Sequence, residues 1–263
     1  MKVSLIAHTQ LSEEFRKQFD YGEQTFPDGY ENNELNDMSV TDGQAVALTA
    51  IRTCYSANKP SEIVAKEGAK YFGSKATDGE AGTEADRLFR QIVRSKHLST
   101  LEHLSFTFAI EGVSRALLAQ LTRHRVGFSF SVQSQRYVRF GSDDKTGGFD
   151  YVVPPSVKES EKIIGLYGDP ETTARDLYEQ VMSDLQVTYD MLREVGIPAE
   201  DARMVLPQAA TTNLVMTANL RALLDFYEKR KSGNGAQWEI AELAERLKDE
   251  VVAVEPWTKP FFE

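Results

Sequence analysis

The chain has 263 residues, of which 41% are hydrophobic and 27% charged, a balance typical of globular proteins that bury a core. Its formal net charge of −10 argues against general nucleic-acid binding, although a local cluster of cations can still bind an anion. No apolar run reaches the roughly 18 residues of a membrane span, the N-terminus does not read as a signal peptide, and a single cysteine, Cys54, excludes an internal disulfide. We therefore expect a cytoplasmic protein.

The first half of the chain is predicted to mix strands and helices. Residues 2–8 read as a strand, and the polar stretch 20–43 reads as a long loop or insertion. Helical periodicity predicts helices over 44–55, 60–72 and 82–97. Residues 102–113 alternate apolar and polar side chains, which predicts a half-buried strand, and Ser114 is placed to cap a helix over 114–125.

The second half is predicted to be mainly helical. Alternation predicts strands near 128–133 and over 211–219. Helices are predicted over 170–196, 199–207, 220–230 and 235–254. We expect an α+β fold, with a central, mostly antiparallel sheet flanked by helices and a helical C-terminal part. We expect one domain over residues 1–263.

Positive charge is concentrated between Leu121 and Phe140, which contain four arginines and one histidine. Arg123, His124 and Arg125 follow a helical pattern, where cations complement the helix dipole. That simple interpretation suffices for one or two such residues. Three consecutive basic side chains diverge from a helix, so we expect them to serve more than one anion or subunit.

A second anion-binding pattern follows at Ser134 and Arg136. In an extended segment, residues two apart lie on the same face, where a hydroxyl and a guanidinium can hold a phosphate together. The pair alone is a weak signal, but it follows shortly after Arg123, His124 and Arg125, called here the basic triplet, and this position strengthens the signal.

These residues together resemble the signature of the flavin-dependent thymidylate synthases, RHRxxSxNxxSxR. Five other segments resemble further motifs of that family, namely 50–57, 99–108, 202–207, 218–226 and 236–240. The similarity therefore runs from about residue 44 to 260. The resemblance implies a homotetrameric enzyme with active sites between subunits. It implies that the enzyme makes dTMP from dUMP, with FAD as cofactor and with NADPH and 5,10-methylenetetrahydrofolate as co-substrates.

The chain departs from the family pattern in several places, of which two are discussed below. One extra residue lies at Val126–Gly127, where glycine can absorb an insertion. Asp225 stands where relatives carry Asn or His.

The resemblance also assigns roles to individual residues. The FAD site would comprise Cys54, His103, Arg123, His124, Arg125, Ser131, Asn219, Arg221 and Asp225. The dUMP site would comprise Gln120, Ser134, Gln135, Arg136, Arg203 and Arg230. Arg230 would face the uracil ring and act as the catalytic residue, because a cation there stabilises negative charge that develops on the ring. No histidine or cysteine spacing of the sequence suggests a metal site.

Simpler interpretations of three residues remain open at the level of sequence. Arg203 could pair with Glu200 on the surface, Arg221 could pair with Asp225 along a helix, and His103 could be a partly buried histidine with its hydrogen bonds satisfied.

Two other functions also remain open, namely a nucleotide- or RNA-binding module and a flavoprotein with another substrate, such as a flavin reductase. Cys54 has no histidine nearby in sequence, which fits chemistry carried by a cofactor rather than by a thiol nucleophile.

Overall fold

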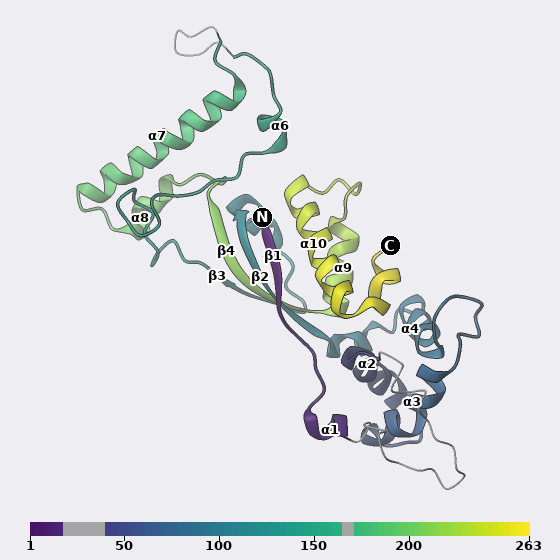
Figure 1. The fold of residues 1–263 in the computed structure, drawn as a ribbon. Coiled ribbons are helices and arrows are strands. Elements are labelled where there is room, and N and C mark those ends of the chain that lie inside the picture. Colours follow the sequence, from purple (N-terminus) through teal and green to yellow (C-terminus); the bar gives the residue numbers. More distant parts are fainter. Residues whose placement is uncertain (18–39, 165–170) are drawn as a thin grey trace. The chain divides into compact units, whose positions relative to one another are not determined.

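The computed structural model describes residues 1–17, 40–164 and 171–263 (Figure 1). Four strands form one sheet in the order β1-β2-β4-β3: β1 (Lys2–His8), β2 (Ser105–Ser114), β4 (Thr211–Asn219) and β3 (Phe128–Val132). The register shows that neighbours run antiparallel. For β3 and β4, Gln133 N donates to Asn213 O, and Asn219 N donates to Gly127 O. Residue numbers thus rise along β3 as they fall along β4, which is the antiparallel arrangement.

Helices make up most of the remaining described structure. The α-helices are α1 (Glu13–Lys17), α2 (Asp42–Thr53), α3 (Ile63–Gly73), α4 (Glu84–Arg94), α5 (Arg115–Leu121), α6 (Pro155–Lys158), α7 (Ala174–Glu194), α8 (Ala199–Ala202), α9 (Leu220–Arg230) and α10 (Trp238–Val254). The 3₁₀ helices are η1 (Pro60–Glu62), η2 (Leu98–His103), η3 (Arg203–Val205) and η4 (Pro256–Phe262). This arrangement confirms the predicted α+β class, antiparallel sheet and helical C-terminal part. None of the described helices is long and apolar enough to cross a membrane.

The chain divides into two compact units. The first unit contains Met1–Val3, Ala109–His124 and Phe130–Met216, and the second contains Ser4–Phe108, Arg125–Ser129 and Thr217–Glu263. Each strand of the sheet contributes residues to both units. The expectation of one domain over residues 1–263 stays a prediction.

The core of the first unit includes side chains of α7 and of the segments that pack against it. Its buried members are Phe140, Phe149, Met182, Tyr189, Ala202 and Ala210. Tyr189 is fully buried, and its hydroxyl accepts a hydrogen bond from Phe140 N at 3.3 Å. The long helix therefore fixes the segment that follows β3.

The core of the second unit lies among α2, α3, α4, α9 and α10, and α9 packs against α10 (Figure 1). Its fully buried side chains include Leu48, Ile51, Phe89, Leu101 and Phe226. Burial raises the pKa of the Glu255 carboxyl, which accepts hydrogen bonds from Gly43 N at 3.2 Å and Trp257 Nε1 at 2.6 Å. These contacts join η4 to the first turn of α2.

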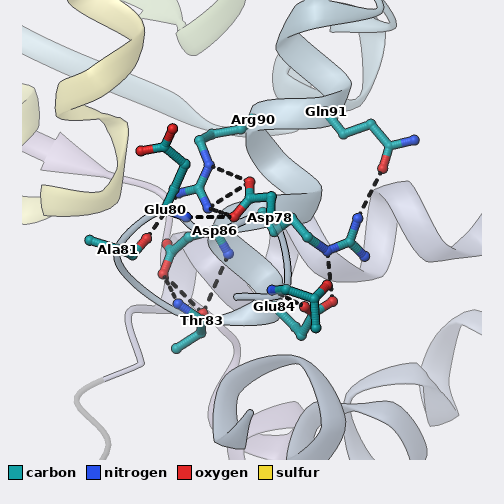
Figure 2. Close-up of polar contacts among 10 residues, drawn as sticks. Asp78, Glu80, Ala81, Thr83, Glu84, Asp86, Arg90 and Gln91 are labelled. Atoms are coloured by element: carbon teal, nitrogen blue, oxygen red, sulfur yellow. Dashed lines mark hydrogen bonds and ion pairs between the residues drawn. The ribbon is translucent and has the colours of Figure 1, made fainter. Parts of the chain in front are cut away.

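A network of charged side chains fixes the loop before α4 (Figure 2). Arg90 holds Asp78 with contacts of 2.9–3.1 Å and also donates to Ala81 O. Thr83 and Asp86 form a capping box at the start of α4. Glu84 accepts from Thr77 N at 2.7 Å and pairs with Arg87 at 2.8 Å, and these contacts lower the pKa of Glu84 to about 2.

The structure corrects the boundaries of two predicted elements. Glu102 and His103 belong to η2 rather than to a strand, because Leu104 N bonds to Leu101 O and closes a tight turn before β2. Helix α5 ends at Leu121, and the hydroxyl of Thr122 bonds back to Leu118 O. The basic triplet therefore follows the helix instead of ending it. Most of the predicted loop over 20–43 lies outside the described residues, and Asp42 and Gly43 already belong to α2.

Candidate active site

The residues assigned to dUMP lie in the first unit, with the exception of Arg230. Gln120 is on α5, Arg203 begins η3, and Ser134, Gln135 and Arg136 follow β3. Residues 135–137 form a turn, so the extended geometry predicted for Ser134 and Arg136 is wrong. The turn is closed by Val138 N donating to Ser134 O at 2.9 Å, and Arg136 N donates to the Ser134 hydroxyl at 3.2 Å. Local hydrogen bonding by the serine thus replaces the strand conformation.

Glu200 holds two of these arginines. Its carboxylate Oε2 lies 2.5 Å from Nε of Arg136. Its backbone carbonyl accepts a hydrogen bond from Nε of Arg203 at 2.9 Å. Arg203 thus pairs with Glu200, as the simpler interpretation has it, but through the backbone carbonyl, because the carboxylate binds Arg136. Arg136 also lies over the Tyr137 ring, 5.5 Å from its centroid.

Arg115 is a candidate that the sequence analysis missed. It is the first residue of α5, and its side chain is partly buried. Burial and then the charge of Arg203 lower the pKa of the Arg115 guanidinium. In the described parts of the chain, no carboxylate forms an ion pair with it. An anion beside these two guanidiniums would be favourable, because it would offset their mutual repulsion.

The sequence did contain a signal for Arg115. A cation in the first turn of a helix opposes the helix dipole, so its presence beside the N-cap Ser114 calls for another cause. Ser114 itself caps α5 as predicted, and its hydroxyl accepts from Leu117 N at 3.0 Å.

Gln135 adds a further donor without a partner. Its side chain is 6% exposed, and its Nε2 has no hydrogen-bond partner among the residues that the structure describes. A buried amide left unpaired is costly, so a partner from outside the chain would bind here favourably.

The basic triplet crosses from one unit to the other. Arg123 and His124 belong to the first unit, and Arg125 belongs to the second. Arg123 and Arg125 are exposed, and Ser131 is exposed on β3 in the first unit.

Cys54 and His103 line one cavity of the second unit, called here the Cys54 cavity. Its volume is about 650 Å³. Thr49, Ala50 and Thr53 of α2 form one wall, and Phe15 of α1 also lines it. His103 is exposed, so the interpretation of a partly buried histidine is wrong. The structure thus brings together two residues that the resemblance assigns to the flavin.

Asn219, Arg221 and Asp225 line a second cavity in the same unit, called here the Arg221 cavity. Its volume is about 620 Å³. Arg221 pairs with Glu102 at 2.5 Å, whereas Asp225 pairs with Lys229 at 2.8 Å. The alternative of an Arg221–Asp225 helix pair is therefore wrong.

The short helix η2 connects these two cavities. Ser99, Thr100 and His103 line the Cys54 cavity, and Leu98 and Glu102 line the Arg221 cavity. A displacement of η2 would therefore alter both.

Gly127 lies at the corner where the resemblance implies one extra residue. Its φ of +77° lies in the left-handed region that favours glycine. A Cβ atom there would lie 2.7 Å from the Ala222 side chain and 2.9 Å from Nδ2 of Asn219. Asn219 in turn caps α9, because its Oδ1 accepts from Ala222 N at 2.9 Å. The backbone at Gly127 therefore packs closely against Ala222 and Asn219, which line the Arg221 cavity.

Arg230 lies in the last turn of α9 and is partly buried. It belongs to the second unit, unlike the other residues assigned to dUMP. No cluster of three or more metal-ligating side chains occurs within residues 1–17, 40–164 and 171–263.

Comparison with known proteins identifies the family. A family model described as thymidylate synthase complementing protein matches residues 35–257. The flavin-dependent thymidylate synthase of Geobacter sulfurreducens is 39% identical over 215 residues, which cover 82% of this chain and 80% of that protein. The one from Nitratidesulfovibrio vulgaris is 40% identical over 210 residues, which cover 76% and 74%.

A solved structure gives the same result. The flavin-dependent thymidylate synthase of Helicobacter pylori, complexed with FAD and dUMP, matches with a TM-score of 0.57 and 26% identity. The match covers 86% of this chain and 96% of that one. The chain belongs to the flavin-dependent thymidylate synthase family.

Proposed function

We propose that this flavin-dependent thymidylate synthase converts dUMP to dTMP, with 5,10-methylenetetrahydrofolate as carbon donor and NADPH as reductant acting through bound FAD. The observation that carries the proposal is that Glu200 holds two arginines of the first unit, in a chain whose net charge is −10. Nε of Arg136 lies 2.5 Å from Oε2 of Glu200, and Nε of Arg203 donates to the Glu200 carbonyl at 2.9 Å. A nucleotide phosphate would supply negative charge for these guanidiniums.

The phosphate of dUMP would be held in the first unit. Arg115 joins the residues assigned from the family resemblance, which are Gln120, Ser134, Gln135, Arg136 and Arg203. Arginine suits this role because its planar guanidinium can donate to two phosphate oxygens at once. Arg230 would lie at the uracil end, where its charge stabilises the negative charge that develops on the ring carbonyls.

FAD would be held mainly by residues of the second unit. The Cys54 cavity has Phe15 and aliphatic side chains among its walls, which suits a flat ring system. The Arg221 cavity offers Arg221, Asn219 and two lysines, which suit phosphates and hydroxyls. Arg123, His124, Arg125 and Ser131 complete the proposed set. When bound, FAD supplies the hydride-transfer chemistry for which the side chains of this chain have no equivalent.

The proposed active enzyme is a cytoplasmic homotetramer whose active sites lie between subunits. The basic triplet supports this proposal, because it follows α5 and includes exposed arginines that can reach ligands or neighbouring chains. Size-exclusion chromatography with light scattering measures the oligomer directly. A fully active monomer would contradict this part of the proposal.

A titration followed by flavin absorbance tests the proposed function. The purified protein should carry FAD and be yellow, and dUMP should change the flavin spectrum. Deoxyuridine, which lacks the phosphate, should do so only at much higher concentration. A yellow protein that does not respond to dUMP favours a flavin reductase, and a colourless protein that binds RNA favours the nucleic-acid-binding alternative.

A further inference from the structure

Glu200 occupies an unusual place among the cations of the first unit. It is the only carboxylate within 4.0 Å of the Arg115, Arg136 or Arg203 side chains in the described structure, and it contacts Arg136. Both partners of that ion pair remain partly in water, because the Arg136 and Glu200 side chains are 57% and 44% exposed. An ion pair of this kind is weak and can be exchanged for a better partner.

The position of Glu200 is fixed by the backbone. It lies in α8, between Pro198 and the fully buried Ala202, and its carbonyl receives the Arg203 side chain. The backbone therefore places the Glu200 side chain within reach of Arg136. Arg136 is also stacked over Tyr137, which further orients its guanidinium.

We propose that Glu200 tunes the affinity for the substrate, because its carboxylate competes with the substrate's phosphate for Arg136. This inference rests on the proposed function, because it takes Arg136 to be a ligand of the dUMP phosphate. A phosphate monoester carries more negative charge than one carboxylate and offers three terminal oxygens, so it displaces Glu200. A ligand without a phosphate cannot.

The decisive experiment compares dUMP affinity in four variants of the FAD-loaded protein. Glu200→Gln keeps the size of the side chain and the backbone carbonyl but removes the charge. It should bind dUMP about twofold to fivefold more tightly, the range expected when one exposed ion pair is lost. Arg136→Ala should bind dUMP about tenfold to a hundredfold more weakly. The double variant should match Arg136→Ala, because Glu200 acts through Arg136.

Asp201→Asn is the matched control. Asp201 is the next residue of α8, it is exposed, and it forms no ion pair in the described structure. Its variant removes the same charge from the same helix, so its dUMP affinity should stay within the error of the wild type. Deoxyuridine affinity should be unchanged by Glu200→Gln.

Three results would overturn the inference. Unchanged or weaker dUMP binding by Glu200→Gln would show that the carboxylate does not compete. If Glu200→Gln raised dUMP affinity equally in the Arg136→Ala background, or if Asp201→Asn raised it as much, the effect would be a general one of charge. A gain for deoxyuridine would place the effect away from the phosphate.

Failure of the proposed function has a different signature. In that case the wild type binds no dUMP, or Arg136→Ala binds it normally, and the inference falls with it. If Arg136→Ala weakens dUMP binding while Glu200→Gln changes nothing, only the competition is refuted.

Discussion

Nη1 of Arg221 lies 2.5 Å from Oε1 of Glu102, and both side chains line the Arg221 cavity. Arg136 and Glu200 show the same relationship in the first unit, also at 2.5 Å. In both units an arginine assigned to a phosphate-bearing ligand is held by a partly exposed glutamate. Each guanidinium is thereby oriented by a glutamate that a stronger anionic ligand could replace.

Arg221→Ala should weaken FAD binding about tenfold to a hundredfold, because a charge-assisted hydrogen bond contributes about 1.5–3 kcal/mol. The measurement is flavin content per protomer after gel filtration, followed by FAD titration of the apoprotein. Arg246→Ala is the control, since Arg246 forms a comparably exposed ion pair with Glu242 on α10. Equal flavin retention by both variants would remove Arg221 from the FAD site.

Gly127→Ala should lower both stability and FAD affinity. Its φ of +77° is strained for alanine, at a cost of about 1–2 kcal/mol, and the new Cβ would press on Ala222 and Asn219. Gly235→Ala separates the two effects, because Gly235 has a similar φ of +73° with no atom within 4 Å of the added Cβ. Both variants should show a lower Tm, and only Gly127→Ala should lose flavin. Loss of flavin from both would refute a specific fit at Gly127.

Glu84→Gln should lower the free energy of unfolding at neutral pH, and the decrease should be smaller at acidic pH. The folded-state pKa of Glu84, about 2, lies below its ordinary value of 4.5. Its contribution is therefore fully present above pH 4.5 and is lost as the pH falls from 4.5 towards 2. Urea unfolding at several pH values should show the gap between wild type and Glu84→Gln closing across that window.

Glu80→Gln is the control for this pH series, since Glu80 is an exposed carboxylate of the same loop (Figure 2). Its unfolding midpoint should follow that of the wild type at every pH. A constant gap between wild type and Glu84→Gln from pH 7 to 2 would show that the Glu84 charge does not stabilise the fold.

Cys54→Ser should keep most of the dTMP-forming activity. The thiol is exposed, and its only hydrogen bond in the described structure is a weak one, 3.8 Å from Ala50 O. It lines a cavity with His103, so a modest change in FAD affinity is compatible with its position. Loss of turnover by several orders of magnitude, with flavin still bound, would instead identify Cys54 as a nucleophile.

Local signals in the sequence predicted much of this fold. Ser114 caps a helix, and the alternation in 211–219 forms a strand, because both depend on neighbours in sequence. The extended geometry at Ser134–Arg136 failed because a serine hydroxyl bonded to nearby backbone and closed a turn.

The partners of the arginines could not be predicted in this way. Glu102 and Glu200 meet Arg221 and Arg136 only after the chain has folded, since each pair is distant in sequence. Arg115 carried a usable signal, because a cation in the first turn of α5 opposes the helix dipole.

The central claim is tested most directly by product formation. Purified protein with FAD, NADPH, 5,10-methylenetetrahydrofolate and dUMP should yield dTMP, detected by chromatography, and omission of any one component should abolish it. Arg230→Ala should retain FAD and lose turnover at saturating dUMP, because its charge acts where the ring becomes negative. A protein that binds FAD and dUMP but forms no dTMP from the complete mixture would contradict the account.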